Sequence, residues 1–290
     1  MSAGLLTRRI LLGFVALYGV AFLLCAVAGT HLSPYSPVEQ HLDLRFLPPL
    51  SPGHLLGTDD FGRDVLSRIM YGARPALLVG VIAVGIALAA GMLIGLAAGL
   101  TGGIVDSTLM LLMDSVLSFP TVLLAITMVA VLGYGVSQVM LAVGIIYSPV
   151  FARIVRAETL SLSAETYVIA SRGLGTRGVR TVFLHIIPNM IPRLLVQGSA
   201  TFALAVVIEA SLSFLGLGTQ PPEASWGLML KDARTYLLQA PWLALFPGIA
   251  IGLTVFSFNY LGDILAEHFG IERTRGLAGT SANLLGRRKG

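Results

Sequence analysis

The sequence has few charged residues and only one cysteine. Asp, Glu, Lys and Arg make up 12% of its 290 residues, about half of the roughly 25% that soluble domains carry. This low share argues against a soluble globular protein. Cys25 lies within an apolar run and has no second cysteine to pair with. An internal disulfide and a thiolate metal cluster are therefore excluded.

The sequence patterns of nucleotide-binding and common hydrolytic sites are also missing. A P-loop requires Gly-Lys followed by Ser or Thr, and the only two lysines, Lys231 and Lys289, follow Leu230 and Arg288. The five histidines form no His-Glu-x-x-His pattern, and no serine stands in Gly-x-Ser-x-Gly. We therefore expect no catalysis and no bound metal or cofactor on this chain, which leaves transport powered from elsewhere.

Long apolar runs are what the chain has in excess. Hydrophobic residues make up 55% of the sequence, and the mean hydropathy is +0.84. A run of about 20 apolar residues suffices to cross a bilayer. The runs predict an all-α integral membrane protein with one transmembrane domain over 1–290. Its six predicted spans are 10–29, 76–100, 104–132, 137–152, 194–217 and 242–265.

The first apolar run has a second interpretation. It follows two arginines and is long enough to span. The tripeptide Ala26-Val27-Ala28 resembles a cleavage site, so a removed signal peptide is the competing interpretation. The run exceeds the roughly 7–15 residues of a signal-peptide core, which favours a retained span.

Two spans contain features that affect helix packing. Gly91, Gly95 and Gly99 form a doubled Gly-x-x-x-Gly pattern in the second span, which allows another helix to approach closely. Pro120 predicts a kink in the third span. Two carboxylates, Asp114 and Glu209, fall inside predicted spans. Each needs a partner or a cavity, so each either lines a translocation path or lies at the interfacial end of its span.

The distribution of positive residues orients the spans. Six spans place both termini on one side, and that side holds 13 of the 19 Lys and Arg residues. Cytoplasmic loops are enriched in these residues, so we expect cytoplasmic termini, a cytoplasmic loop at 153–193 and a cytoplasmic tail at 267–290. The 30–75 loop and the 219–240 segment are then external, with a short interfacial amphipathic helix at 64–71. Arginines at span ends do not indicate nucleic-acid binding.

The 153–193 loop contains a polar-flanked segment that predicts two short helices joined by a glycine turn. Ser163 is a candidate N-cap of the first helix, whose apolar face carries Tyr167, Ala170 and Leu174. Gly175 permits the turn; a plain helix C-cap there predicts similar geometry. The second helix follows Thr176, and Pro188 is expected to end it. Its apolar face carries Val179, Val182, Phe183, Ile186 and Ile187.

This segment resembles the cytoplasmic coupling motif of ABC-importer permeases. That motif is Glu-Ala-Ala, three residues, Gly, nine residues and a hydrophobic stretch closing on Leu-Pro. The matching positions are Ile169-Ala170-Ser171, Gly175 and the stretch 185–188 that closes on Pro188. The glycine and proline spacing holds, whereas Ile169 replaces the glutamate and Ser171 replaces the second alanine.

Further stretches are similar to the second permease of dipeptide, oligopeptide and nickel importers. They are HLLGTDDFGRDVLSR at 54–68, EASLSFLGLGTQPPEASWG at 209–227 and FNYLGD at 258–263. The resemblance covers about 54–265, and residues 266–270 depart from the family's usual Asp-Pro-Arg-like end.

The resemblance implies a type I-like permease in the bacterial inner membrane, working in a heteromeric importer. Its implied partners are a homologous second permease, two cytoplasmic ATPases that hold ATP and Mg, and an extracytoplasmic substrate-binding protein. The coupling residues are then Tyr167, Ala170, Ser171, Arg172, Leu174, Gly175, Val179, Phe183 and Pro188. Candidate contacts to the binding protein or gate are Asp59, Asp60, Arg63 and Asp64; candidate path residues are Asp114 and Glu209.

Several alternatives remain open at this stage. Tyr167, Leu174 and Phe183 face either an ATPase or the chain's own spans. Arg172, Arg177 and Arg180 pair with either ATPase acids or lipid headgroups. The external acids either contact a partner or a cation or form local caps. An ion-coupled secondary transporter is the alternative function, although no internal repeat supports it. A membrane-embedded enzyme or scaffold lacks its nucleophile–base set. The motifs do not distinguish peptide, glutathione and nickel-chelate substrates.

Overall fold

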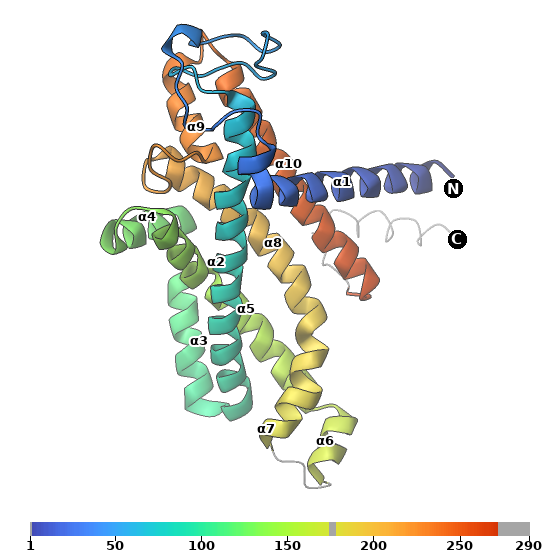
Figure 1. Ribbon diagram of the computed structural model, residues 1–290. Helices are drawn as coiled ribbons and strands as arrows, with labels where there is room; N and C mark the ends of the chain where they lie inside the picture. The colour runs from blue at the N-terminus through green and yellow to red at the C-terminus, as the bar shows by residue number, and fades with distance from the viewer. Residues whose placement is uncertain (1, 174–177, 272–290) are drawn as a thin grey trace, which may run out of the picture.

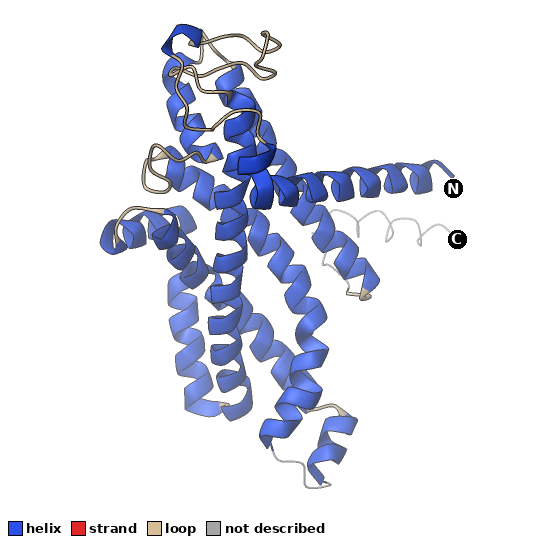
Figure 2. Ribbon diagram, viewed as in Figure 1, coloured by secondary structure: helices blue, strands red, loops and turns tan. Residues whose placement is uncertain are grey.

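The computed structural model describes residues 2–173 and 178–271, and in these ranges the regular structure is helical (Figures 1 and 2). This confirms the all-α prediction. The helices are α1 (Ser2–Leu32), α2 (Val65–Thr101), α3 (Gly103–Leu117), α4 (Thr121–Leu132), α5 (Val136–Ser163), α6 (Thr166–Gly173), α7 (Gly178–Thr181), α8 (Ile187–Phe214), α9 (Trp226–Ala233) and α10 (Trp242–His268). Shorter turns are η1 (Leu42–Leu44), the π-helical η2 (Val182–Ile186) and η3 (Arg234–Tyr236).

Among the described residues, five helical segments are long and apolar enough to span a membrane. They are α1, α2, α5, the continuous Gly178–Phe214 segment and α10. The predicted third span is broken: α3 and α4 meet at 94°, and counting them as one gives six. Pro120 precedes α4 at its N-cap. A proline lacks the N–H that would continue α3, so the predicted kink becomes a break.

Three helix boundaries differ from the predictions. Residues 64–71 form no separate interfacial helix, because Asp64 caps α2 and the helix runs on for 37 residues. The fourth span is not short, since α5 continues through Ser163 with Pro149 inside it. Pro188 does not end the second module helix. The Ile187 N–H donates to the Val182 carbonyl in the π-helical turn, and this shifted pairing carries the helix past the proline.

Helices α2 and α5 pack closely against each other, and the glycines of α2 allow their backbones to approach. A Cβ added at Gly91 would lie 2.4 Å from the Phe151 Cβ, and one at Gly95 would lie 2.6 Å from the Ala152 carbonyl oxygen. A Cβ added at Gly99 would lie 2.8 Å from the Thr159 Cβ. The predicted close approach of another helix to this glycine pattern is confirmed.

An aromatic cluster joins the remaining long helices to α2. The Phe22 ring of α1 lies 6.0 Å from Trp226 of α9 and 6.1 Å from Phe258 of α10. Phe258 in turn stacks on Phe202 of α8 at 3.7 Å. The Trp226 indole N–H donates to the Ile69 carbonyl at 3.0 Å, so the polar edge of this buried ring is satisfied.

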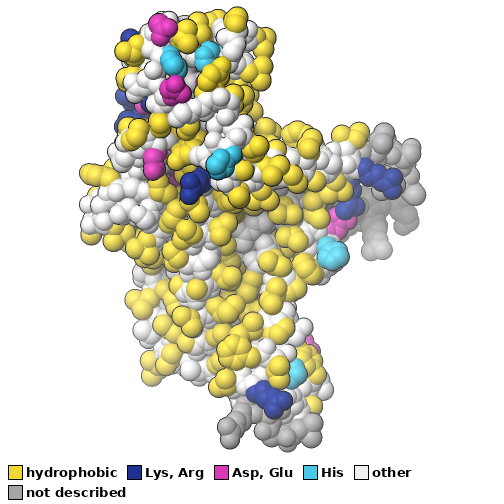
Figure 3. All heavy atoms as spheres, viewed as in Figure 1, with side chains coloured by type: hydrophobic (Ala, Val, Ile, Leu, Met, Phe, Trp, Pro, Cys, Tyr) yellow, Lys and Arg dark blue, Asp and Glu magenta, His cyan; other side chains and the backbone are white. Residues whose placement is uncertain are grey.

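Two smaller regions lie at opposite ends of an apolar body. Loop 33–64 and residues 226–241, which include α9 and η3, form one end, which we call the cap, and α6 and α7 lie at the opposite end (Figure 1). Hydrophobic side chains cover most of the visible surface between them (Figure 3). Arg8 of α1 forms an ion pair with Glu267 at the end of α10, with an N–O distance of 2.6 Å. The two termini therefore leave the body near each other.

Candidate functional site

The predicted coupling segment forms a compact module at one end of the molecule. We call residues 164–173 and 178–186 the α6–α7 module. It begins where Ala164 caps the end of α5. Ser163 is the last residue of α5 and not the N-cap of α6, so that prediction was wrong. The Glu165 carbonyl instead accepts the first N–H groups of α6, those of Val168 and Ile169, both at 3.0 Å.

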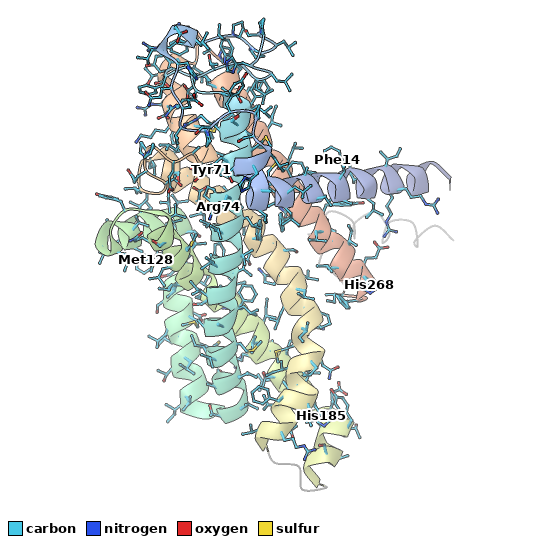
Figure 4. All side chains as sticks on the ribbon, in the orientation of Figure 1. Phe14, Tyr71, Arg74, Met128, His185 and His268 are labelled. Atoms are coloured by element: carbon cyan, nitrogen blue, oxygen red, sulfur yellow. The ribbon has the colours of Figure 1, made fainter. Side chains whose placement is uncertain are left out.

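The module exposes apolar side chains on its outer surface. Tyr167, Val179 and Phe183 are 45%, 70% and 65% exposed. Tyr167 also contacts the ring of His185 edge-on, with centroids 6.0 Å apart, which holds α6 against the π-helical turn. Figure 4 labels His185 at this end. His185 therefore packs within the module.

The other predicted coupling residues fall in or beside the module. Ala170 and Pro188 are exposed, Ser171 is half-buried, and Arg172 lies in α6. Leu174 and Gly175 lie outside the described residues, as do Thr176 and Arg177. Ile169, which stands where the family motif has glutamate, is exposed at 57%. It therefore adds to the apolar surface in place of a polar group.

A buried core attaches the module to the body. Ile186 is buried with Phe151 and Val155 of α5 and with Met190 of α8. Arg193 of α8, whose side chain is 55% exposed, forms an ion pair with Glu158 of α5 and so joins these two helices to each other. Because α5 and α8 enter and leave the module, a force applied to it is transmitted directly to both helices.

Two more ion pairs join α3 to α5. Arg153 donates to the Asp114 carboxylate at 2.6 Å, and Arg156 donates to Asp106, with one N–O distance of 2.6 Å. The Asp114 side chain is 53% exposed, so it is not the deeply buried carboxylate that its place in the sequence indicated. Sequence reasoning missed the Asp106 pair. The sequence contained one indication of this pair: Arg153 and Arg156 are three residues apart, which places them as neighbours on the surface of α5.

The four predicted external residues lie inside the cap. Asp59 accepts from the Arg63 Nε at 2.6 Å, and Arg68 lies 3.5 Å from the same carboxylate. Asp64 caps α2 by accepting from the Ser67 N–H at 2.8 Å. Since Asp59, Arg63 and Asp64 are buried, they order the loop rather than present charges on its surface.

This environment shifts the pKa values of two acids of the cap. Burial, together with the neighbouring Asp59 charge, raises the pKa of Asp60 above its ordinary value. Burial likewise raises the pKa of Asp232 in α9, against the opposing effect of Arg68. Asp232 reaches Arg63 at 3.9 Å. The network therefore joins the loop, the start of α2 and α9 in one electrostatic unit.

Glu209 is buried rather than aligned along a path. Only 1% of the residue is exposed, and the Ser213 hydroxyl donates to its carboxylate at 2.7 Å. The Thr219 N–H donates to the same Ser213 oxygen at 3.1 Å. The group therefore fixes the end of α8 to the following loop, and the structure does not bring Glu209 and Asp114 together.

Comparison with known proteins identifies the family. Residues 91–271 match the family described as binding-protein-dependent transport system inner membrane component. A dipeptide transport system permease protein of Escherichia coli (strain K12) is 43% identical over 255 residues, covering 86% of this chain and 85% of that protein. A glutathione transport system permease protein of Pectobacterium atrosepticum is 40% identical over 265 residues, covering 90% and 88%.

Solved structures show the same fold. An inward-facing structure of the MetNI methionine ABC transporter matches with a TM-score of 0.57 at 18% identity, covering 72% of this chain and 97% of that one. An amino acid ABC transporter matches at 0.55 and 16% identity, covering 70% and 94%. These relationships support a permease subunit over an ion-coupled secondary transporter. The chain belongs to the binding-protein-dependent transport system inner membrane component family, and it is a multi-pass permease of the ABC transporter type.

Proposed function

We propose that this chain forms half of the translocation pathway of an ATP-driven importer for di- or oligopeptides or a related small solute. A second, homologous permease supplies the other half. Two ATPases, which hold ATP and Mg, and an extracytoplasmic binding protein complete the assembly. The names of the relatives at 40–43% identity, which include dipeptide and glutathione permeases, support this substrate class.

The exposed apolar surface of the α6–α7 module carries the proposal. Tyr167, Val179 and Phe183 are solvent-exposed at the end of the molecule, beyond the apolar body. Contiguous exposed apolar side chains mark interaction surfaces, and a short helix is well suited to enter a groove of a partner. We assign the ATPase as that partner.

The attachment of the module explains how the partner moves the pathway. Closure of the two ATPases displaces the module, and α5 and α8 move with it because both are continuous with it and Ile186 packs against both. The tight α2–α5 contact then extends the movement to α2 and to the cap above it. Rigid helices that move as a unit are a common means of switching between two states.

The proposed orientation places the module and both termini in the cytoplasm of a bacterial cell. The excess of Lys and Arg on that side supports it. The Arg8–Glu267 ion pair also supports a common side for the two ends of the chain. The cap is then external, where it meets the binding protein.

Substitution of Phe183 tests the assignment. Phe183→Glu places a charge on the exposed surface without disturbing the core. We expect it to reduce co-purification of the ATPases from mild detergent by about 30-fold, the loss typical of a hot spot of about 2 kcal/mol. Leu238→Glu, at a fully exposed position of the cap, is the matched control and should retain the ATPases. Unchanged ATPase recovery with Phe183→Glu contradicts the proposal.

A further inference from the structure

A pocket with charges of both signs lies just below the cap. It has a volume of about 360 Å³, within the range of small-molecule sites. Its walls come from α2, the start of α5 and the loop before α9, and they include Tyr71, Arg74, Leu78, Ser137, Met140 and Glu223. Figure 4 labels Tyr71 and Arg74 on successive turns of α2.

Arg74 and Glu223 line this pocket, and both residues are exposed. Among the described residues, neither side chain has an ion-pair partner, and the two do not pair with each other. By contrast, the nearby cap residues Asp59, Arg63 and Arg68 are joined in one network. Figure 3 shows charged side chains of both signs between the cap and the apolar body. Two separated, opposite charges are complementary to a ligand that carries both.

The pocket lining supplies both an anion-binding group and a cation-binding group. Arg74 lies about 14 Å along α2 from its first residue at 1.5 Å per residue. Val136 and Ser137 of the first turn of α5 also line the pocket, and the first turn of a helix has unpaired N–H groups and the positive end of the helix dipole. Glu223 lines the pocket from a turn that its own N–H closes onto the Gln220 carbonyl at 3.2 Å.

The pocket also has an apolar part. Leu78, Val136 and Met140 line it, so a hydrophobic side chain has favourable surface to contact there. An arginine is well suited to bind a carboxylate with two parallel hydrogen bonds. A carboxylate such as Glu223 is suited to bind an ammonium group.

We propose that this pocket is a transient subsite for the zwitterionic backbone of a short peptide. Arg74 and the α5 N-terminus bind the terminal carboxylate, Glu223 binds the terminal ammonium, and the apolar wall contacts a side chain. The inference rests on the proposed function, because the pocket lies at the external end only in the proposed orientation. A transit site must also release its ligand, so we expect a dissociation constant on the order of 1 mM.

Direct binding measurements without the binding protein test the subsite. The purified complex of this chain with its partner permease and ATPases, in phosphatidylglycerol nanodiscs, is titrated with alanyl-phenylalanine by saturation-transfer NMR. We expect Arg74→Gln to weaken binding about tenfold, the effect of losing one charge-assisted contact in an open pocket. The C-terminal amide of the dipeptide lacks the carboxylate, so it should bind the wild type as weakly as the unmodified dipeptide binds Arg74→Gln. Arg74→Gln should not weaken binding of this amide further.

Glu223→Gln should likewise weaken binding of the dipeptide. The N-acetyl dipeptide lacks the ammonium group, so it should bind the wild type as weakly as the dipeptide binds Glu223→Gln, and Glu223→Gln should not weaken its binding further. Arg234→Gln removes an exposed arginine of the cap outside the pocket and is the matched control, with unchanged binding expected. The proposal is overturned if the wild type does not bind the dipeptide, or if both pocket variants bind it as the wild type does.

Two further measurements distinguish a peptide from a lipid in the pocket and the subsite from the substrate class. A zwitterionic lipid headgroup has the same chemistry as the peptide backbone, so the titration is repeated in phosphatidylethanolamine nanodiscs. Loss of dipeptide binding there, with dipeptide uptake unaffected by Arg74→Gln, assigns the pocket to lipid and overturns the peptide subsite. Uptake of the dipeptide by the wild-type importer is measured in parallel. Uptake without pocket binding rejects the subsite alone, whereas absence of both also rejects the proposed substrate class.

Discussion

Replacement of Gly95 by alanine tests whether α2 and α5 depend on direct backbone contact. A Cβ at this position would lie 2.6 Å from the Ala152 carbonyl oxygen and 2.7 Å from the Val155 Cβ. Ordinary contacts begin at 3.4 Å, so the two helices must separate locally by about 0.8 Å. The oxygen belongs to the backbone and cannot rotate away.

Gly85 in the same helix gives a matched control, because an added Cβ there has nothing within 4 Å. Both substitutions gain the same helix propensity of alanine over glycine, about 1 kcal/mol in water. The difference between the two variants therefore isolates the cost of overpacking. Insertions into a well-packed core cost about 1–3 kcal/mol, and we expect Gly95→Ala to be less stable than Gly85→Ala by that amount.

The single cysteine provides the assay. Cys25 is partly buried in α1, and a fluorogenic thiol reagent reports its exposure as the purified protein is heated. We expect a midpoint several degrees lower for Gly95→Ala than for Gly85→Ala. Equal midpoints for the two variants would refute the reasoning that the glycines of α2 are required for contact with α5.

The remaining predictions concern the charged groups and use the same thermal measurement. Arg68→Met removes a buried partner of Asp59 and should cost about 3 kcal/mol. Arg153→Gln breaks an exposed pair with Asp114 and should cost less than about 1 kcal/mol; equal losses for these two variants would contradict the assigned burial. Because the pKa of Asp60 is raised in the folded protein, the folded state binds more protons there than the unfolded state does. Its contribution to stability should therefore fall as pH rises from about 4 through the raised pKa, and Asp60→Asn should flatten this dependence.

Local properties of the sequence were sufficient to predict the spans and one major helix contact. Apolar runs mark the spans because burial in a bilayer requires about 20 such residues. The spacing of Gly91, Gly95 and Gly99 marks a contact because only glycine allows backbones to approach so closely. Pro120 marks a kink because its missing N–H is a property of the residue itself, although the structure has a 94° break there.

Features that depend on the surroundings were not predictable. The polar residues at 64–71 indicate an interfacial surface, but Arg68 is buried because the cap folds over it. Pro188 indicates a helix end, but the preceding turn becomes π-helical and accommodates it. Asp114 and Glu209 are both acids within apolar runs, yet one forms an exposed ion pair and the other is buried against a serine. Such partners become adjacent only in the folded chain.

Cross-linking from the module tests the central claim most directly. Val179 is 70% exposed, and Val179→Cys in a Cys25→Ala background places a lone thiol on the proposed docking surface. Leu238→Cys in the same background is the control at the cap. Disulfide trapping in membranes that contain the assembled importer, with cysteines along the ATPase groove, should give an adduct from Val179→Cys whose yield changes with ATP. If Val179→Cys gives no more ATPase adduct than Leu238→Cys in any nucleotide state, the module does not dock on an ATPase and the account is contradicted.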